Sequence, residues 1–258
     1  MKRFSAALLA LGLGTATLFT QLPVRAAEET ADTAADTAVQ TADPSIVTTN
    51  GIQGWPQASD ISSTAAIVME TSTNTVLYSK NADQALYPAS AVKVMTCLMA
   101  LENSSLDDQV TMTATGVSGV TDGGANISAQ LDEVFTMEQC LYAIMVASAN
   151  DIALQVAEHI SGSVEDFVAA MNTRAQELGC TNTVFTNPTG LPDENQHTTA
   201  HDMALIMEAA MANDTFRTIA QTTSYTIPAT NVSGGDRVLT NNFTMINSSG
   251  DSYYEPCI

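Results

Sequence analysis

A serine and a lysine three residues apart, Ser90 and Lys93, stand where a strongly apolar stretch of this chain begins. Residues i and i+3 share one helix face, so the amine can lie beside the hydroxyl and accept its proton. Pro88 predicts a helix start nearby and serine is a favoured cap, so we expect Ser90 at the positive end of the helix dipole. Residues 94–101 are apolar on nearly every side, which predicts a buried helix. A lysine one turn into such a helix is costly unless it has a partner or a chemical role.

Ser148-Ala149-Asn150 forms a second polar element between two apolar, helix-like runs, 137–147 and 151–160. In a tight bend between two helices, the side chains of a Ser-x-Asn can point out of the same corner. The competing interpretation is an ordinary capping turn, because Ser, Asn and Asp are common helix-start residues. Ser-x-x-Lys is also common by chance, so neither element alone identifies a catalytic site.

Taken together, the two elements resemble the active-site serine penicillin-recognising enzymes. Within them, four ordered stretches resemble the D-alanyl-D-alanine carboxypeptidases, the low-molecular-mass penicillin-binding proteins. The stretches are Tyr87-Pro88-Ala89-Ser90-x-x-Lys93-x-Met95-Thr96, Ser148-x-Asn150-Asp151, Leu178-Gly179-x-x-Asn182-Thr183-x-Phe185-x-Asn187-Pro188-x-Gly190-Leu191 and Thr198-Thr199-Ala200-x-Asp202-Met203-Ala204. The resemblance runs from about Ala65 to the last residue.

The chain departs from this family at its third motif, Lys-Thr-Gly, which lies on a strand at one wall of the cleft. No lysine follows Lys93, and neither Arg217 nor Arg237 is followed by Thr-Gly. In the family, a segment like residues 252–258 comes just before that motif. We therefore expect an incomplete gene product in which the C-terminal strands are missing.

Apolar patterning predicts an α+β fold. Residues 65–70 and 75–79 read as a β-hairpin, and residues 225–227 and 237–240 as short strands. Helical patterns lie between them, at 90–102, 137–147, 151–160, 164–178 and 200–212, the last with a capping-box pattern from Thr199 to Asp202. The resemblance adds the β-lactamase/penicillin-binding-protein transpeptidase-like fold, an antiparallel sheet flanked by helices with a helical lobe and a cleft between.

The resemblance also implies roles for four side chains. Ser90 is the nucleophile that carries the acyl group, Lys93 is the general base, Ser148 relays a proton, and Asn150 binds the substrate. The implied partners are a peptidoglycan stem peptide that ends in D-Ala-D-Ala and β-lactam antibiotics, with no cofactor and no metal. The chain as printed is expected to be inactive, because the missing motif supplies part of the cleft.

Three alternatives remain. A class A β-lactamase shares the fold and the first two motifs, but residues 187–191 resemble the carboxypeptidase loop instead of a loop with a catalytic glutamate. A transpeptidase or endopeptidase could use the same residues. A non-catalytic cell-wall-binding protein could keep the fold, although such a protein should lack some of Ser90, Lys93, Ser148 and Asn150.

The chain divides into three parts. Residues 1–26 are predicted to be a signal peptide, with Lys2 and Arg3, an apolar core and a cleavage site at 24–26; an uncleaved anchor is the alternative. Residues 27–50 are an acidic flexible linker that cannot bury enough surface to fold. Residues 51–258 are long enough for one catalytic domain. The protein is therefore expected to be exported and to act at the outer face of the cell envelope, secreted or membrane-associated.

The net charge of −20 excludes nucleic-acid binding. Removal of residues 1–26 takes away three basic residues and no acid, which leaves 5 basic and 28 acidic residues, a net charge of −23. Lys80 and Lys93 are then the only lysines.

Cysteines and histidines give weaker signals. Cys97 and Cys140 lie in apolar helix-like runs, so buried free thiols are favoured over disulfides among the four cysteines, Cys180 and Cys257 included. The three histidines show no metal-ligand spacing.

Overall fold

The computed structural model describes residues 6–10, 49–58, 61–120 and 124–246. The expected cleavage site, most of the linker, residues 252–258 and Cys257 lie outside these ranges. The α-helices are α1 (Val92–Asn103), α2 (Ala114–Ser118), α3 (Met137–Ala147), α4 (Asn150–Ser161), α5 (Val164–Glu177), α6 (Ala200–Met211) and α7 (Asp214–Ala220). The strands are β1 (Ala6–Ala10), β2 (Ala66–Glu70), β3 (Thr75–Lys80), β4 (Gln109–Thr111), β5 (Val134–Thr136), β6 (Ser224–Ile227) and β7 (Arg237–Thr240).

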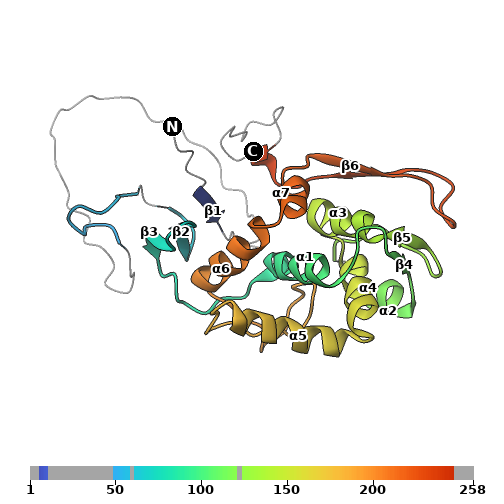
Figure 1. Ribbon diagram of the computed structural model, residues 1–258, viewed down its shortest axis with the longest axis horizontal. Coiled ribbons are helices and arrows are strands. Elements are labelled where there is room, and N and C mark those ends of the chain that lie inside the picture. Colours follow the sequence, from blue (N-terminus) through green and yellow to red (C-terminus); the bar gives the residue numbers. More distant parts are fainter. Residues whose placement is uncertain (1–5, 11–48, 59–60, 121–123, 247–258) are drawn as a thin grey trace, which may run out of the picture.

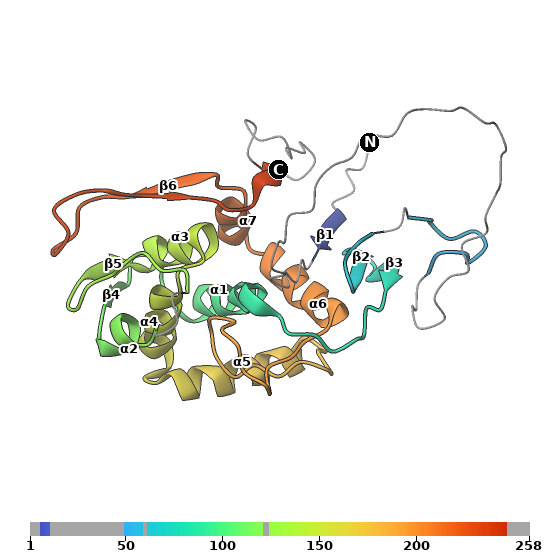
Figure 2. The same cartoon turned by 180° about the vertical axis from the view of Figure 1, so that it is seen from behind.

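Helix α1 is the centre of the helical part. It packs against α3, α4, α5, α6 and α7. Figures 1 and 2 show α1 in the middle of these helices, with α5 on one side and α3 and α7 on the other. Its residues from Val92 to Ala100 are all buried. This surrounding explains why the sequence of α1 is apolar on every side and has no polar face.

Side-chain caps fix where several helices begin. Thr136 and Gln139 form a reciprocal capping box at the start of α3. Ser163 accepts the Asp166 N–H at the start of α5. At α6, Thr199 accepts the Asp202 N–H, but the Asp202 carboxylate accepts hydrogen bonds from residues 182 and 183, so only half of the predicted capping box forms.

The described strands form three small antiparallel sheets. The first has the order β1-β2-β3, and the others are the pairs β4–β5 and β6–β7. The hairpin β2–β3 is the one predicted, and helix α6 packs against β2. β1 lies inside the segment predicted to be a signal peptide and pairs with β2 on the side away from β3. Helices and antiparallel sheets together confirm the α+β fold.

The hairpin β6–β7 lies along α3, and its tip reaches β4–β5 (Figure 1). Tyr225 stacks on Tyr142 of α3 with ring centroids 3.8 Å apart. At the tip, Arg237 makes two hydrogen bonds, of 2.7 and 2.9 Å, to the fully buried Glu133. Burial by itself raises the pKa of Glu133, but hydrogen bonds from Arg237 and Thr230 outweigh it and the pKa is lowered. The hairpin is thus fixed at both ends.

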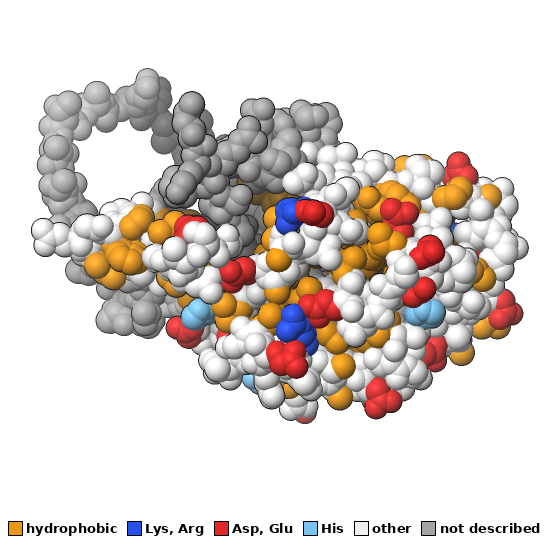
Figure 3. Space-filling model, in the orientation of Figure 1, with side chains coloured by type: hydrophobic (Ala, Val, Ile, Leu, Met, Phe, Trp, Pro, Cys, Tyr) orange, Lys and Arg blue, Asp and Glu red, His pale blue; other side chains and the backbone are white. Residues whose placement is uncertain are grey.

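The surface agrees with the acidic composition. In Figure 3, acidic side chains are scattered over the face and each of the few basic ones lies beside an acidic one. Within the described ranges, no helix is long and apolar enough to cross a membrane. Cys97, Cys140 and Cys180 are buried free thiols, so the expectation for these three is confirmed.

The sequence analysis did not predict some of the short elements. β4, β5, α2 and α7 have three to seven residues, too few for a periodic pattern. The start of α1 was also placed too early. Residues 89–91 form a 3-10 turn and the α-helix begins at Val92.

Candidate active site

Ser90 lies at the entry to α1, in the 3-10 turn that precedes the helix. The sequence analysis expected the Ser90 side chain to cap the helix, and this expectation is wrong. The N-cap is Ala91, which has no side-chain hydrogen bond. Pro88 is buried before it, and Ala89 has a φ of 47°, a left-handed conformation unusual for a residue with a side chain. The Ser90 hydroxyl is therefore exposed and is not used in the helix start.

Lys93 lies one turn further into α1, with 3 % of its surface exposed. Its Nζ donates to the Thr189 carbonyl at 2.6 Å and to Ser90 Oγ at 3.4 Å. Burial lowers the pKa of Lys93 to about 8, and a weaker electrostatic effect of Cys97 opposes this shift. The amine therefore has a much larger neutral fraction at neutral pH than an exposed lysine.

Ser148 occupies the bend between α3 and α4. It ends α3 in a left-handed conformation, with φ 56° and ψ 35°, and its Oγ donates to Ser90 Oγ at 3.2 Å. Residues other than glycine in this conformation cost roughly 1–3 kcal/mol each and cluster at functional sites. Both Ala89, the chain neighbour of Ser90, and Ser148, its hydrogen-bond partner, have this conformation.

Asn150 begins α4, and its side chain is buried. A Cβ at position 124 would lie 2.5 Å from Asn150 Nδ2, so a larger residue there would have to displace this amide. Its Oδ1 is the one buried side-chain oxygen or nitrogen without a hydrogen-bond partner in the described part of the chain. A buried acceptor without a partner is uncommon, and it leaves this amide able to bind a further group.

Asp151, the next residue, holds the loop beside the site. Its carboxylate accepts the N–H groups of Ile127, Ala129 and Ile152 at 3.0–3.3 Å. Burial raises the pKa of Asp151, although these backbone hydrogen bonds act in the opposite direction. The loop that carries residues 124 and 125 is thereby fixed against Asn150, whose backbone N–H donates to Ala125.

The sequence analysis missed the contact that lies closest to Lys93. Residues 187–190 pass over the start of α1, and Gly190 has a φ of 81°. A Cβ on Gly190 would lie 1.9 Å from the Ala89 carbonyl oxygen, so this loop can approach Ser90 only with glycine there. The Asn-Pro-x-Gly pattern marks a tight turn, but nothing in it shows which residues the turn contacts.

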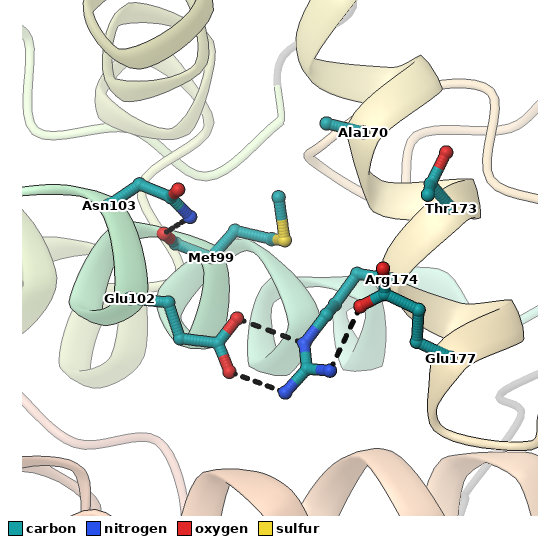
Figure 4. A pocket seen from close by; sticks show the side chains of 7 residues that line it. All are labelled: Met99, Glu102, Asn103, Ala170, Thr173, Arg174 and Glu177. Atoms are coloured by element: carbon teal, nitrogen blue, oxygen red, sulfur yellow. Dashed lines mark hydrogen bonds and ion pairs between the residues drawn. The ribbon is translucent and has the colours of Figure 1, made fainter.

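A separate hollow of about 450 Å³ lies at the other end of α1, between α1 and α5 (Figure 4). Arg174 crosses it and pairs with Glu102 and Glu177, at 2.8 and 3.1 Å. Asn103 Nδ2 donates to the Met99 carbonyl oxygen. Each guanidinium nitrogen of Arg174 already has a carboxylate partner, so we read the hollow as the site of a structural ion pair.

The chemistry available at the site is that of a serine, an amine and a second hydroxyl. In the described ranges, no group of three or more His, Cys, Asp or Glu side chains could hold a metal ion. Three of the four predicted residues, Ser90, Lys93 and Ser148, are joined by hydrogen bonds. Asn150 follows Ser148 by two residues, across the bend between α3 and α4. No described hydrogen bond connects its side chain to the other three.

Solved structures with the same architecture support the fold. D-alanyl-D-alanine carboxypeptidase from Mycobacterium tuberculosis H37Rv has a TM-score of 0.69 at 29 % identity, over 76 % of this chain and 73 % of that one. A mutant of the Streptomyces K15 DD-transpeptidase has a TM-score of 0.69 at 28 % identity, over 74 % and 78 %. The penicillin-binding-protein fold that the sequence implied is thus confirmed.

Sequence relatives point the same way. D-alanyl-D-alanine carboxypeptidase DacF of Bacillus subtilis is 40 % identical over 147 residues, which are 55 % of this chain and 37 % of the relative. DacB2 of Mycobacterium tuberculosis is 33 % identical over 180 residues, 68 % of this chain and 58 % of the relative. The chain thus spans roughly two to three fifths of these relatives' lengths. The profile of the D-alanyl-D-alanine carboxypeptidases matches residues 52–249, and the chain belongs to that family.

Proposed function

We propose that this chain carries the nucleophile, base and proton relay of a serine-type D-alanyl-D-alanine carboxypeptidase. The observation that carries the proposal is the exposed Ser90 hydroxyl, with an amine at 3.4 Å on one side and a second hydroxyl at 3.2 Å on the other. An activated serine nucleophile needs an adjacent base within hydrogen-bond reach, often at a longer distance before the substrate binds.

In the proposed acylation, Ser90 Oγ attacks the carbonyl carbon between the two terminal D-alanines and its proton passes to the neutral Lys93 Nζ. The peptide C–N bond then breaks as Ser148 Oγ passes its proton to the departing D-alanine nitrogen and receives in its place the proton held by Lys93. An ester to Ser90 Oγ and a neutral amine remain. The Ser90 N–H supplies half of the oxyanion hole. Water hydrolyses the ester and restores the hydroxyl.

Asn150 is proposed to bind the substrate's amide with its side chain. Its buried Oδ1 without a partner and its Nδ2 against position 124 support this role. β-Lactams would acylate Ser90 in the same way and leave slowly. The family's Lys-Thr-Gly motif, which would bind the substrate carboxylate, has no counterpart in the printed sequence, where the last lysine is Lys93.

The test is labelling with a fluorescent penicillin in the protein as its gene encodes it. Ser90→Ala should abolish the covalent band. Ser104→Ala is the matched control, because Ser104 is at the far end of α1 and its hydroxyl donates only to the Ala100 carbonyl. A band that persists in Ser90→Ala would overturn the assignment of the nucleophile.

A transpeptidase or endopeptidase reaction would use the same side chains. Two of the relatives are named D-alanyl-D-alanine endopeptidases, with 31 and 30 % identity, and one structural relative is named a DD-transpeptidase. Product analysis separates the reactions: a carboxypeptidase releases free D-alanine, an endopeptidase cuts cross-links, and a transpeptidase needs an amine acceptor. We propose the carboxypeptidase reaction on the outer face of the cell envelope, with peptidoglycan stem peptides as substrate.

A further inference from the structure

Two side chains of α1 bind two consecutive carbonyl groups of the 187–190 loop. Lys93 Nζ donates to the Thr189 carbonyl at 2.6 Å, and Thr96 Oγ1 donates to the Pro188 carbonyl at 2.7 Å. Residues 93 and 96 share a helix face, so the loop lies along that face. Thr96 has no exposed surface, and Pro188 and Thr189 are buried as well.

The loop itself is held in shape by one amide side chain. Asn187 Oδ1 accepts from Thr189 N, Thr189 Oγ1 and Gly190 N at 2.8–3.2 Å, and Asn187 Nδ2 donates to the Leu191 carbonyl at 3.0 Å. The carbonyl groups of Pro188 and Thr189 are thereby kept on the side that faces α1.

These contacts have a consequence for the lysine. A neutral amine has one lone pair, which must point at the Ser90 hydroxyl if the amine is to accept its proton. Donation to the Thr189 carbonyl fixes one N–H and so limits where the lone pair can point. The same loop covers Nζ and keeps water away from it.

We propose that Thr96 is a positioning residue for the base: by binding the Pro188 carbonyl it keeps the 187–190 loop closed over Lys93, so that the amine stays dry and aimed at Ser90. This inference rests on the proposed function only where it says that Lys93 acts as a base. The arrangement of Thr96, the loop and the amine can be tested without any turnover.

The charged and titratable groups around Lys93 do not explain why its pKa is lowered. From α1 itself the Cys97 thiol acts on the amine, in the direction that raises its pKa. From the α3–α4 bend, Ser148 is uncharged, and the Asp151 carboxylate is turned to the N–H groups of residues 127, 129 and 152. Residues 187–191 contain no ionisable side chain, and no ion pair of Lys93 is described. Burial is thus the main cause of the lowered pKa of Lys93, and the 187–190 loop contributes to that burial through the bond from Nζ to the Thr189 carbonyl.

The chain offers an unusually clean measurement, because Lys2, Lys80 and Lys93 are its only lysines. With ¹³C at lysine Cε, an NMR titration follows three signals, and Lys93→Arg identifies the one that disappears. In the unmodified chain this signal should titrate near pH 8. Thr96→Val keeps the side-chain shape and removes the hydroxyl, so the midpoint should rise by roughly one pH unit or more as water reaches the amine.

Thr96→Ser is the matched variant, because it keeps the hydroxyl and removes a methyl group. If the hydrogen bond to Pro188 is what matters, Thr96→Ser should keep the midpoint near that of the unmodified chain. A midpoint that is unchanged in Thr96→Val, or that moves as far in Thr96→Ser as in Thr96→Val, would overturn the proposal. Should Thr96→Val not fold, Asn187→Ala opens the loop from its other side and should raise the midpoint in the same way.

A second arm separates this inference from the proposed function. In the protein as its gene encodes it, the acid limb of the pH profile for penicillin acylation should move to higher pH in Thr96→Val, by as much as the NMR midpoint moves. Absence of acylation in the unmodified protein would refute the proposed function, whereas the NMR midpoints would still decide the role of Thr96. Acylation whose acid limb does not move in Thr96→Val would refute the positioning role alone.

Discussion

The helical part and the N-terminal sheet β1–β2–β3 differ in how they bury apolar surface. Helices supply most of the main core, in which residues such as Met95, Leu141 and Phe167 have no exposed surface. Among the residues whose burial the structure describes, the second cluster, which lies beside the sheet, has four buried members, Ala65, Ile67, Ala82 and Ala200. Ala200 belongs to α6, so the sheet depends on a helix for part of even this small core.

This difference shows which part of the molecule holds the side chains of the site in place. Ser90 and Lys93 lie at the start of α1, and Ser148 and Asn150 lie at the bend between α3 and α4, which pack against α1. Side chains that must be held to within fractions of an ångström are best placed on elements fixed by dense packing. The sheet contacts this part through α6, and we expect changes in the sheet to affect the four side chains much less.

The largest effect should separate the two lysines of the folded part, Lys93 in α1 and Lys80 in β3. Lys93→Arg keeps the charge but removes the proposed base, because a guanidinium does not deprotonate in proteins. We expect penicillin acylation to fall by roughly two to four orders of magnitude. Lys80→Arg is the control and should acylate normally, since Lys80 Nζ donates to the Ile61 carbonyl, outside the site. A near-native rate in Lys93→Arg would assign the base to another group.

Truncation of one buried side chain in each part tests the difference in packing. Phe167→Ala in α5 should lower the free energy of unfolding by about 3–5 kcal/mol, as is usual for a large side chain in a dense core. Ile67→Ala in β2 should cost about 2 kcal/mol, the lower end for its type, because its cluster is small. Urea denaturation measures both. Equal losses would show that the sheet is packed as tightly as the helices.

The buried amine should make the stability of the helical part depend on pH. The pKa of Lys93 is about 8 in the folded chain and near 10.5 when unfolded, so the unfolded state binds more protons between these values and stability rises with pH there. The free energy of unfolding of the unmodified chain, minus that of Lys93→Met, should therefore increase by roughly 3 kcal/mol between pH 7 and pH 10.5. A difference that stays constant over this range would mean that Lys93 is solvated like a surface lysine.

The smallest effect should come from the ion pair between α1 and α5. Glu102→Gln removes the main partner of Arg174 in Figure 4, and both side chains are partly exposed. Exposed pairs contribute about 0–1 kcal/mol, so the unfolding midpoint should hardly change. A loss comparable to that of Phe167→Ala would show that charge pairs, and not apolar packing, hold α5 on α1.

The sequence predicted both parts about equally well: the bounds of the long helices and of the hairpin β2–β3 agree with the structure to within two residues at each end. Residues 137–147 and 237–240 were predicted with the bounds that the structure has. For α3 the reason is physical: a long apolar run follows the Thr136–Gln139 capping box, so local signals and tertiary packing agree. Short strands such as β4 and β5 lack that redundancy, because three residues show no period.

The residue spacing predicts the local part of the site, whereas the partnership of Ser90 with Ser148, 58 positions further on, came from the family resemblance. Ser90 and Lys93 are three residues apart, and the helix geometry that joins them can be read from the chain. The bonds from Thr96 to Pro188 and from Lys93 to Thr189 cross 92 and 96 positions. No local pattern contains such contacts, and the αL conformations of Ala89 and Ser148 are equally set by their surroundings.

The length of chain between Lys93 and Thr189 also sets the order of events when the protein folds. Contacts that close large loops form late, because the chain must first lose much of its freedom. Until residues 187–190 reach α1, the amine is in water and protonated, and Ser90 has no base. If Ser90 reacts as proposed, a partly folded chain is unreactive, and reactivity towards an acyl donor becomes a kinetic marker for the last steps of folding.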